Sequence, residues 1–182
     1  MENTIFSIVI FFLFTFSVSA QVKGSIESQN LIKEGMVSPQ INIYLQSEIK
    51  SVDDFSWTVW GLISKKWAES YIGLIYSPSK GVEVSLSYGP ETNDPGQRLG
   101  WSFWMSKSNL SLTSIFEQGG SGYWFKHTLL YSLGKFNLGG HYQRGRGAGP
   151  RVEFNFSNFQ VWGSYLLDKD KNNSYLGLKL KF

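Results

Sequence analysis

The sequence predicts an all-β protein: a closed antiparallel transmembrane β-barrel of about twelve strands. Three observations lead to this prediction. Apolar and polar side chains alternate in pieces of about eight to eleven residues, helical periodicity is nearly absent, and tight connections alternate with longer polar ones. A ten-strand barrel, in which two pieces merge, is the alternative.

The alternation identifies the individual strands. In 82–88, valine, leucine and tyrosine alternate with glutamate and serine, and 136–143 and 151–156 show the same period of two. Glycine, asparagine, aspartate, proline and serine interrupt the pattern at the expected turns. This reading gives eleven strands between Gln40 and Phe182.

The connections predict the topology. Tight turns at one rim and longer polar loops at the other are typical of outer-membrane barrels, although 65–66 is short where a long loop is due. Because a closed antiparallel barrel needs an even number of strands, a twelfth is expected before Ser38, within 22–32, where the alternation is weak. The expected tight turns are 51–54, 78–80, 106–109, 134–135 and 157–158, and the expected loops are 89–96, 117–122, 144–149 and 168–173.

The N-terminal segment predicts export. Residues 5–18 are almost wholly apolar, but they are fewer than the about 20 residues that a membrane-spanning helix needs. Small residues follow at Val18, Ser19 and Ala20, so we expect a signal peptide, 1–20, cleaved after Ala20. The mature chain, 21–182, is then a single barrel domain. An N-terminal anchor helix is the alternative, because the first four residues contain no lysine or arginine.

Composition argues against several classes of function. The chain has no cysteine, which excludes a disulfide scaffold, a thiolate metal site and a lipid-modified cysteine. The net charge of +3 is spread without a basic block, which disfavours nucleic acid as a partner. With two histidines and no cysteine, no metal constellation is present, and we expect no cofactor.

The alternating faces indicate which side meets lipid. Nearly every strand carries large apolar side chains on one face, more than a narrow interior holds, and charged side chains on the other. Aromatic residues recur near strand ends, as a membrane-interface girdle requires. They include Trp57, Tyr76, Tyr88, Trp101, Tyr123 and Tyr165.

The last strand resembles the C-terminal insertion signal of Gram-negative outer-membrane β-barrel proteins. That pattern has a polar residue, then a glycine five residues before the C-terminal residue, and hydrophobic or aromatic residues at the antepenultimate and final positions. The residues at these positions are Tyr175, Gly177, Leu180 and Phe182. Tyr175 is only half polar, and Leu180 is aliphatic where an aromatic is common. The resemblance implies an outer-membrane location, and it implies that the barrel-assembly machinery reads this strand.

The inward set defines a candidate lumen. Two-residue turns place Thr128 opposite His141 and Trp162 beside Glu153. A loop at 145–149 places His141 opposite Glu153, so that His141, Glu153 and Lys179 are expected to form a row. A structural ion pair is the simpler reading of such a row. The candidate lumen residues are Glu69, Glu83, Lys126, His141, Arg151, Glu153, Trp162 and Lys179, and the further inward tryptophans are Trp60, Trp104 and Trp124.

Two features lie outside the lumen. A hairpin places Ser114 across from His127 on the lipid-facing side, a pair similar in kind to that of outer-membrane lipid hydrolases. No acidic third member and no hydrolase signature accompany it, and a histidine of the aromatic girdle is the structural alternative. The segment 144–151 is expected to be a surface loop whose arginines touch anionic lipopolysaccharide.

These observations favour a small outer-membrane barrel, porin-like or structural, with a lumen partly filled by aromatic and charged side chains. Small polar solutes are its expected partners besides lipid. A rim lipid hydrolase using Ser114 and His127 is the second hypothesis. A soluble periplasmic barrel that binds a lipophilic ligand is the third.

Overall fold

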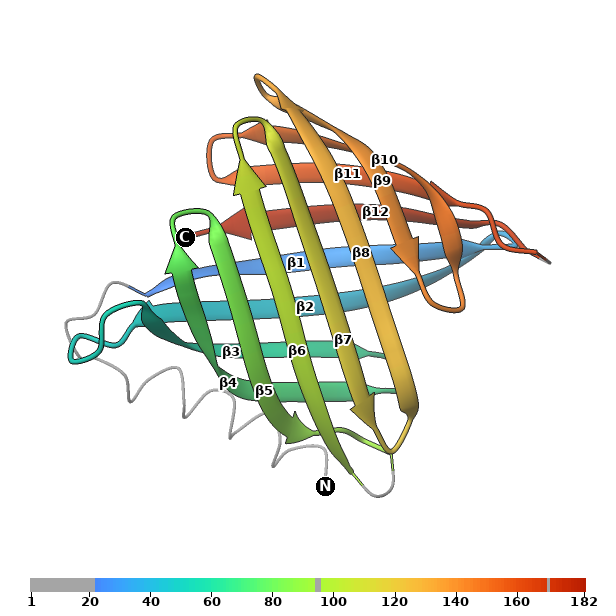
Figure 1. Ribbon diagram of the computed structural model, residues 1–182. Helices are drawn as coiled ribbons and strands as arrows, with labels where there is room; N and C mark the ends of the chain where they lie inside the picture. The colour runs from blue at the N-terminus through green and yellow to red at the C-terminus, as the bar shows by residue number, and fades with distance from the viewer. Residues whose placement is uncertain (1–21, 94–95, 170) are drawn as a thin grey trace.

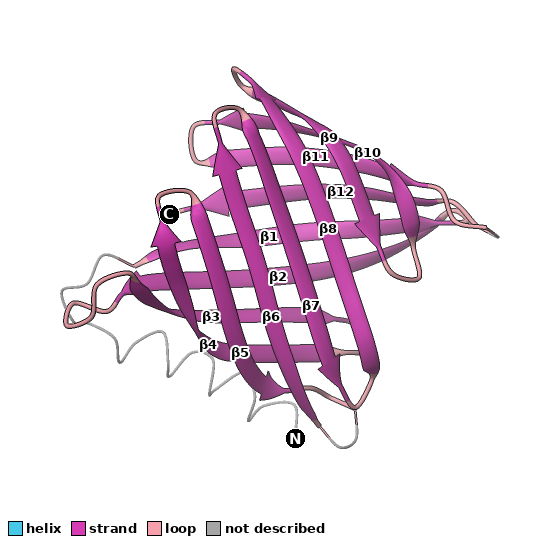
Figure 2. Cartoon of the chain, in the orientation of Figure 1, coloured by secondary structure: helices cyan, strands magenta, loops and turns pink. Residues whose placement is uncertain are grey.

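The computed structural model describes residues 22–182, except 94–95 and 170, so the predicted signal peptide lies outside the described residues. Every regular element in the described part is a strand (Figure 2). The strands are β1 Lys23–Lys33, β2 Met36–Glu48, β3 Phe55–Ser64, β4 Ala68–Ser79, β5 Val82–Pro90, β6 Gln97–Lys107, β7 Leu110–Gly119, β8 Gly122–Leu133, β9 Phe136–Gln143, β10 Gly147–Phe156, β11 Phe159–Leu166 and β12 Asn173–Lys181.

The strands close into a barrel. Each pairs antiparallel with its neighbours in sequence, and β12 pairs with β1 with Leu180 opposite Ile26. Two backbone hydrogen bonds between Gly24 and Phe182, of 2.8 and 3.0 Å, extend this seam to the last residue. The predicted closed barrel of twelve strands is therefore confirmed, including the strand expected before Ser38.

The strands are strongly tilted. In Figure 1, β5–β8 form the front wall and cross β1, β2, β11 and β12 of the back wall at a steep angle. This crossing is expected because the strands of a closed barrel tilt relative to its axis. The rim at which Lys23 and Phe182 lie is called the terminal rim here, and the opposite end is called the distal rim.

The apolar face points outward. Ile72, Leu86 and Leu176 are 60%, 60% and 52% exposed, whereas Tyr71 and Tyr175, which precede Ile72 and Leu176 in sequence, are 3% and 6% exposed. This arrangement suits lipid, and it is opposite to that of a soluble barrel with a lipophilic cavity. No segment among the described residues forms a helix that is long and apolar enough to cross a membrane.

The connections differ less in length between the two rims than the sequence predicted. The expected loop 117–122 is mostly strand, with a turn only at 120–121, and the expected loop 144–149 shrinks to 144–146. Conversely, the terminal rim carries the six-residue connection 49–54. Glycines caused the error, because Gly147 and Gly149 are paired strand residues. A Cβ on Gly149 would lie 1.8 Å from the Tyr165 carbonyl oxygen, so the close backbone approach requires glycine there.

A small hydrophobic core lies inside the barrel. Leu31, Trp162, Leu166 and Tyr175 form a buried cluster from β1, β11 and β12. These side chains fill part of the lumen on that side, which agrees with the expectation of a partly filled interior.

Candidate functional site

The register places every predicted lumen residue on the inward face. Among them, Glu69, His141, Arg151, Glu153 and Trp162 are buried. The remaining three, Glu83, Lys126 and Lys179, are half-buried. The lumen is therefore lined by charged groups of both signs, and these gather in two clusters and one mouth.

The first cluster surrounds Arg98 near the distal rim. The Arg98 Nε lies 3.3 Å from a Glu69 oxygen and 3.2 Å from a Glu117 oxygen, and its Nη1 lies 3.4 Å from a Glu91 oxygen. Arg98 also donates a hydrogen bond to Ser121, and its Cζ lies over the Trp67 ring, 5.8 Å from the ring centroid. Three carboxyl groups thus face one guanidinium, and all four residues are buried, at 2–7% exposure.

This cluster ties four strands to two turns. Tyr71 donates a hydrogen bond of 2.9 Å to Glu69, and the Ser121 backbone N–H donates one of 2.9 Å to Glu91. Burial alone would raise the pKa of Glu91, but the hydrogen bonds from Ser121 and the nearby Arg98 guanidinium hold it below the ordinary value. Sequence reasoning missed Arg98 and Glu117 as partners because it assigned 117–122 to a loop.

The second cluster is basic and lies on β1, β8, β10 and β12. The Lys179 Nζ pairs with Glu27 at 2.8 Å, and the Trp162 Nε1 donates to the same carboxylate at 2.8 Å. The Arg151 guanidinium lies 3.7 Å from the centroid of the Trp162 ring. Stacking of this kind is favourable, because the ring face carries negative charge density.

Lys126 completes the basic cluster from the front wall. Its Nζ lies 5.7 Å from the Trp124 ring centroid. The carboxylates within its electrostatic range are Glu27 and Glu117, and the cations are Arg151 and Lys179. None of the ion pairs found in the described part of the chain includes Lys126. Its charge is therefore less compensated than that of its neighbours.

The expected row of His141, Glu153 and Lys179 is wrong in register. His141 lies opposite Gly149, and Glu153 lies opposite Asn137, because β10 begins at Gly147, three residues earlier than the predicted loop 145–149 allowed. Lys179 lies opposite Gln160 and pairs with Glu27. The two pairings set by tight turns, Thr128 with His141 and Glu153 with Trp162, are confirmed.

Glu153 belongs to a well-satisfied network. Arg151, Asn137 and Gln160 donate hydrogen bonds of 2.7, 2.8 and 2.7 Å to its carboxylate. His141 accepts from or donates to Thr128 at 3.2 Å through Nδ1, whereas its buried Nε2 has no partner. The simplest role of Glu153 is to hold Arg151 in place across β9, β10 and β11.

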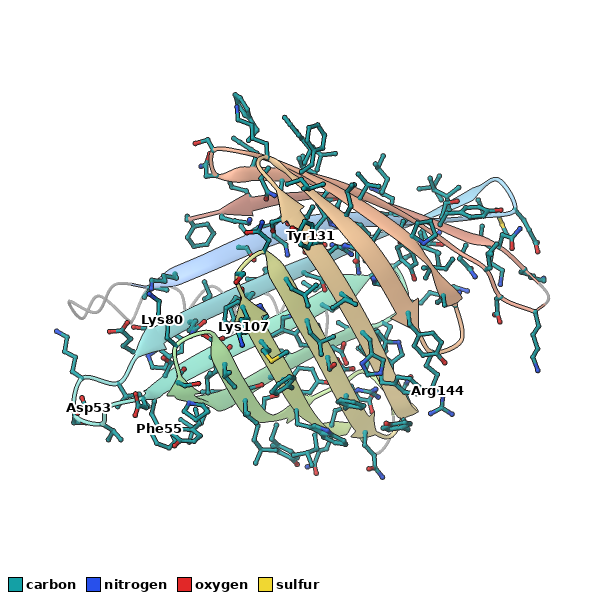
Figure 3. All side chains as sticks on the ribbon, turned by 45° about the horizontal axis from the view of Figure 1, so that its top comes forward. Asp53, Phe55, Lys80, Lys107, Tyr131 and Arg144 are labelled. Atoms are coloured by element: carbon teal, nitrogen blue, oxygen red, sulfur yellow. The ribbon has the colours of Figure 1, made fainter. Side chains whose placement is uncertain are left out.

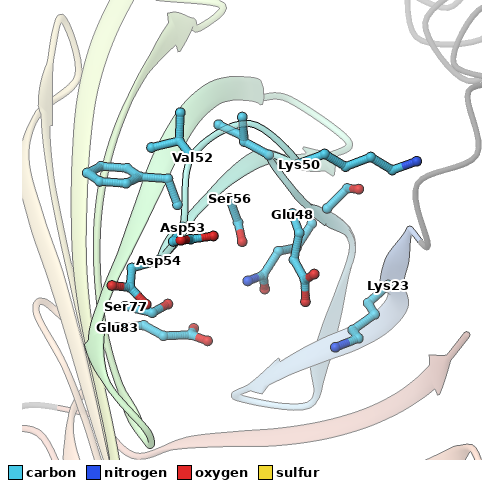
Figure 4. A pocket seen from close by; sticks show the side chains of 13 residues that line it. Lys23, Glu48, Lys50, Val52, Asp53, Asp54, Ser56, Ser77 and Glu83 are labelled. Carbon is cyan, nitrogen blue, oxygen red and sulfur yellow. The ribbon is translucent and has the colours of Figure 1, made fainter.

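An acidic pocket lies at the terminal rim. It has a volume of ≈ 410 Å³ and is lined by Glu48, Asp53, Asp54 and Glu83, with Lys23 facing them. Figure 4 shows these side chains around the mouth of the barrel. The barrel therefore has a basic cluster inside and an acidic mouth at this end.

The insertion-signal residues have clear structural positions. Tyr175 is buried inside the barrel, whereas Phe182 is 58% exposed at the end of the chain. Gly177 lies beneath Trp162, and a Cβ at this position would be 2.1 Å from the indole nitrogen. Leu180 lies on the outward face opposite Ile26. Gly177 thus provides space for the ring that contacts Glu27 and Arg151.

Ser114 and His127 meet on the outward face as predicted. Ser114 Oγ lies 3.0 Å from His127 Nδ1, and the two residues are directly paired across β7 and β8. The ring neighbours of His127 are Phe116, Phe125 and Tyr142. No carboxylate among the described residues hydrogen-bonds His127, so the pair lacks the third group that orients a catalytic histidine.

The chain forms a closed antiparallel barrel of twelve strands that is apolar outside and charged inside. This is the fold of small outer-membrane β-barrels. Solved structures of this class are similar to the chain. The KdgM porin, in complex with disordered oligogalacturonate, has a TM-score of 0.62 at 10% identity over 87% of this chain and 99% of that chain. The NanC porin gives 0.56 at 8% identity over 86% and 100%.

A third structure extends the comparison. The CymD monoaromatic hydrocarbon channel has a TM-score of 0.51 at 8% identity over 90% of this chain and 88% of that chain. No family model matches the sequence, and no curated protein matches it either. The predicted class, that of Gram-negative outer-membrane β-barrels, is thus confirmed at the level of fold.

Proposed function

We propose that this protein is a narrow outer-membrane channel for small polar solutes, with a preference for anionic ones. The observation that carries the proposal is the basic cluster of Lys126, Arg151 and Lys179 inside a barrel of porin fold. Glu27 and Glu153 are the carboxylates paired with this cluster, so the three cations exceed them. Cations that line a narrow, low-dielectric passage concentrate anions there.

The acidic residues around Arg98 do not oppose this preference strongly. Glu69, Glu91 and Glu117 are 5%, 7% and 2% exposed, and the guanidinium faces all three. In contrast, the Lys179 side chain is 26% exposed. A solute in the lumen therefore meets Lys179 more directly than the buried carboxylates.

The fold comparison suggests a class of solute. The KdgM porin was captured with oligogalacturonate, a chain of sugar acids. Carboxylates on such a chain match lysine and arginine through charge-assisted hydrogen bonds. We therefore propose short acidic oligosaccharides as solutes to test first in this protein.

Membrane location and assembly belong to the same proposal. The chain is exported, its signal peptide is removed after Ala20, and the assembly machinery closes β12 onto β1 in the outer membrane. The terminal rim then faces the periplasm, as the ends of the chain do in a barrel of an even number of strands. The outward apolar face and the seam that reaches Phe182 support this arrangement.

Ion selectivity in a planar bilayer tests the proposal. Under a tenfold potassium chloride gradient, we expect the reversal potential of the 21–182 chain to show an excess of chloride over potassium flux. Lys126→Gln should shift the reversal potential toward cation selectivity, because it removes the least compensated charge. Lys107→Gln is the matched control, since Lys107 lies on the outward face at the terminal rim (Figure 3). Equal shifts in both variants would contradict the proposal.

A further inference from the structure

An aromatic cluster covers the outward face of β6–β9. Its rings contact one another with centroid separations from 5.3 to 6.2 Å. The surface combines flat apolar rings with the hydrogen-bonded pair of Ser114 and His127, which is unusual on a face that meets lipid tails. We call it the ring cluster, and its members are Trp101, Phe116, Tyr123, Phe125, His127 and Tyr142.

A positive charge is fixed at the distal end of the ring cluster. Arg144, in the connection between β9 and β10, donates from Nη1 to the Tyr123 carbonyl oxygen at 2.5 Å, and its guanidinium lies 5.2 Å from the centroid of the Tyr123 ring. The Arg144 backbone N–H also donates to the Phe125 carbonyl oxygen at 3.0 Å. The side chain is exposed at the barrel edge (Figure 3).

This geometry prepares Arg144 for an anion. A guanidinium has five N–H donors in a planar fork, and the contact with Tyr123 uses one of its nitrogens. The donors that remain are held at the rim by the carbonyl and the ring, so little side-chain freedom is lost on binding. Phosphate is the group that this fork matches best in a membrane interface.

His127 adds a second polar contact deeper in the membrane. It lies four residues from Tyr123 along β8, or about 13 Å at the usual rise per residue. Ser114 occupies its Nδ1, which leaves Nε2 for a partner in the lipid. The carbonyl groups that join acyl chains to a lipid headgroup lie below its phosphates, and a histidine N–H at that depth can donate to them.

We propose that the ring cluster and Arg144 form a binding site for a phosphorylated glycolipid of the outer leaflet, of the lipid A type. Arg144 binds a phosphate, the rings pack against acyl chains, and His127 donates to an acyl carbonyl. This site is separate from the lumen, so it does not depend on conduction. It also gives the Ser114–His127 pair a role that needs no third catalytic group.

Binding of defined lipids to the purified 21–182 chain tests the site. Native mass spectrometry in a neutral detergent would count bound diphosphoryl lipid A, with phosphatidylglycerol and phosphatidylcholine as comparison lipids. We expect lipid A to bind at least tenfold more tightly than either. Arg144→Gln should weaken lipid A binding about tenfold, a loss of about 1.4 kcal/mol. Lys169→Gln, which removes a charge from another distal connection, should leave it unchanged.

The outcomes separate the alternatives. Equal weakening by Arg144→Gln and Lys169→Gln would overturn the site in favour of diffuse charge attraction, and phosphatidylglycerol binding as tight as lipid A would overturn its glycolipid preference. His127→Phe keeps a ring in place and should weaken lipid A binding without abolishing it. Recovery of lipid A that has lost an acyl chain would overturn a binding role and support hydrolysis. Heat-modifiable gel mobility verifies that each variant is folded.

Discussion

Arg98 shows how much a single side chain holds in place. It faces Glu69, Glu91 and Glu117 and also donates to Ser121 and to the Gly122 carbonyl oxygen. These contacts join β4, β6, β7 and β8 to the connection after β5 and to the turn after β7. Because all three carboxylates are buried, removing the guanidinium leaves each of them without its counter-charge.

We therefore expect Arg98→Met to destabilise the barrel by about 3–5 kcal/mol. Urea unfolding in detergent micelles, followed by tryptophan fluorescence, would measure this loss. Glu69→Gln is the informative companion, since it replaces one of the three buried carboxyl groups with a neutral amide and keeps an oxygen that accepts from Tyr71. It should change stability little or raise it, and a loss as large as that of Arg98→Met would contradict the interpretation of the cluster.

Gly177, in contrast to Arg98, has a role that is set by its contact with one side chain. A methyl group there would overlap the Trp162 indole. We expect Gly177→Ala to displace that ring from Glu27 and to cost about 1–3 kcal/mol, the usual cost of overpacking.

The matched control for Gly177→Ala is Gly163→Ala, because a Cβ on Gly163 would meet only the Tyr175 carbonyl oxygen at 3.6 Å. The same urea titration compares the two variants. If they are equally stable, the ring does not depend on Gly177.

Single residues were predictable where a tight turn fixed the register. The turn at 134–135 placed Thr128 against His141, and the hairpin after β7 placed Ser114 against His127. Partners across the lumen were not predictable in this way. The contact of Trp162 with Glu27 joins residues separated by 135 positions, and only closure of the barrel brings them together.

Among the elements, β1 and β10 show where pattern reading fails. In β1 the outward positions include Ser28 and Asn30, whereas the inward Leu31 belongs to the interior core, so the strand lacks a clean apolar face. Only the need for an even strand number indicated it. In β10 the glycines at its start look like a loop in sequence, although close backbone packing requires them in the sheet.

We expect the seam between β1 and β12 to depend on the last residue of the chain. Deletion of Phe182 removes both backbone hydrogen bonds to Gly24 and the aromatic residue of the proposed insertion signal. We expect a smaller folded fraction in the outer membrane, measured by heat-modifiable gel mobility.

Phe182→Tyr is the control for this deletion, because it keeps the backbone pairing and an aromatic ring. It should assemble nearly as well as the parent chain. Normal assembly of the deletion variant would show that the assembly machinery does not need the final residue.

At the scale of the whole molecule, the barrel is apolar outside and polar inside. This arrangement, which is opposite to that of a soluble barrel, was predictable because large apolar side chains alternate with charged ones on most strands. The distribution of charge within the lumen was not predictable, since it depends on which strands face each other across the barrel. The structure separates an Arg98 cluster rich in carboxylates from a basic cluster around Lys126.

The acidic mouth at the terminal rim should oppose the basic cluster. Glu48 and Glu83 line it, with Asp53 and Asp54 beside them. We expect Glu48→Gln to increase anion selectivity, opposite in sign to Lys126→Gln, and reversal potentials of the two variants would show this. Shifts of the same sign would mean that the mouth lies outside the permeation path.

Single-channel conductance of the refolded 21–182 chain in a planar bilayer is the most direct test of the account. The account predicts reproducible small conductance steps that a short oligogalacturonate interrupts more than a neutral oligosaccharide of equal length. An absence of conductance steps from protein shown to be folded and inserted would contradict the account, because the interior side chains would then close the lumen.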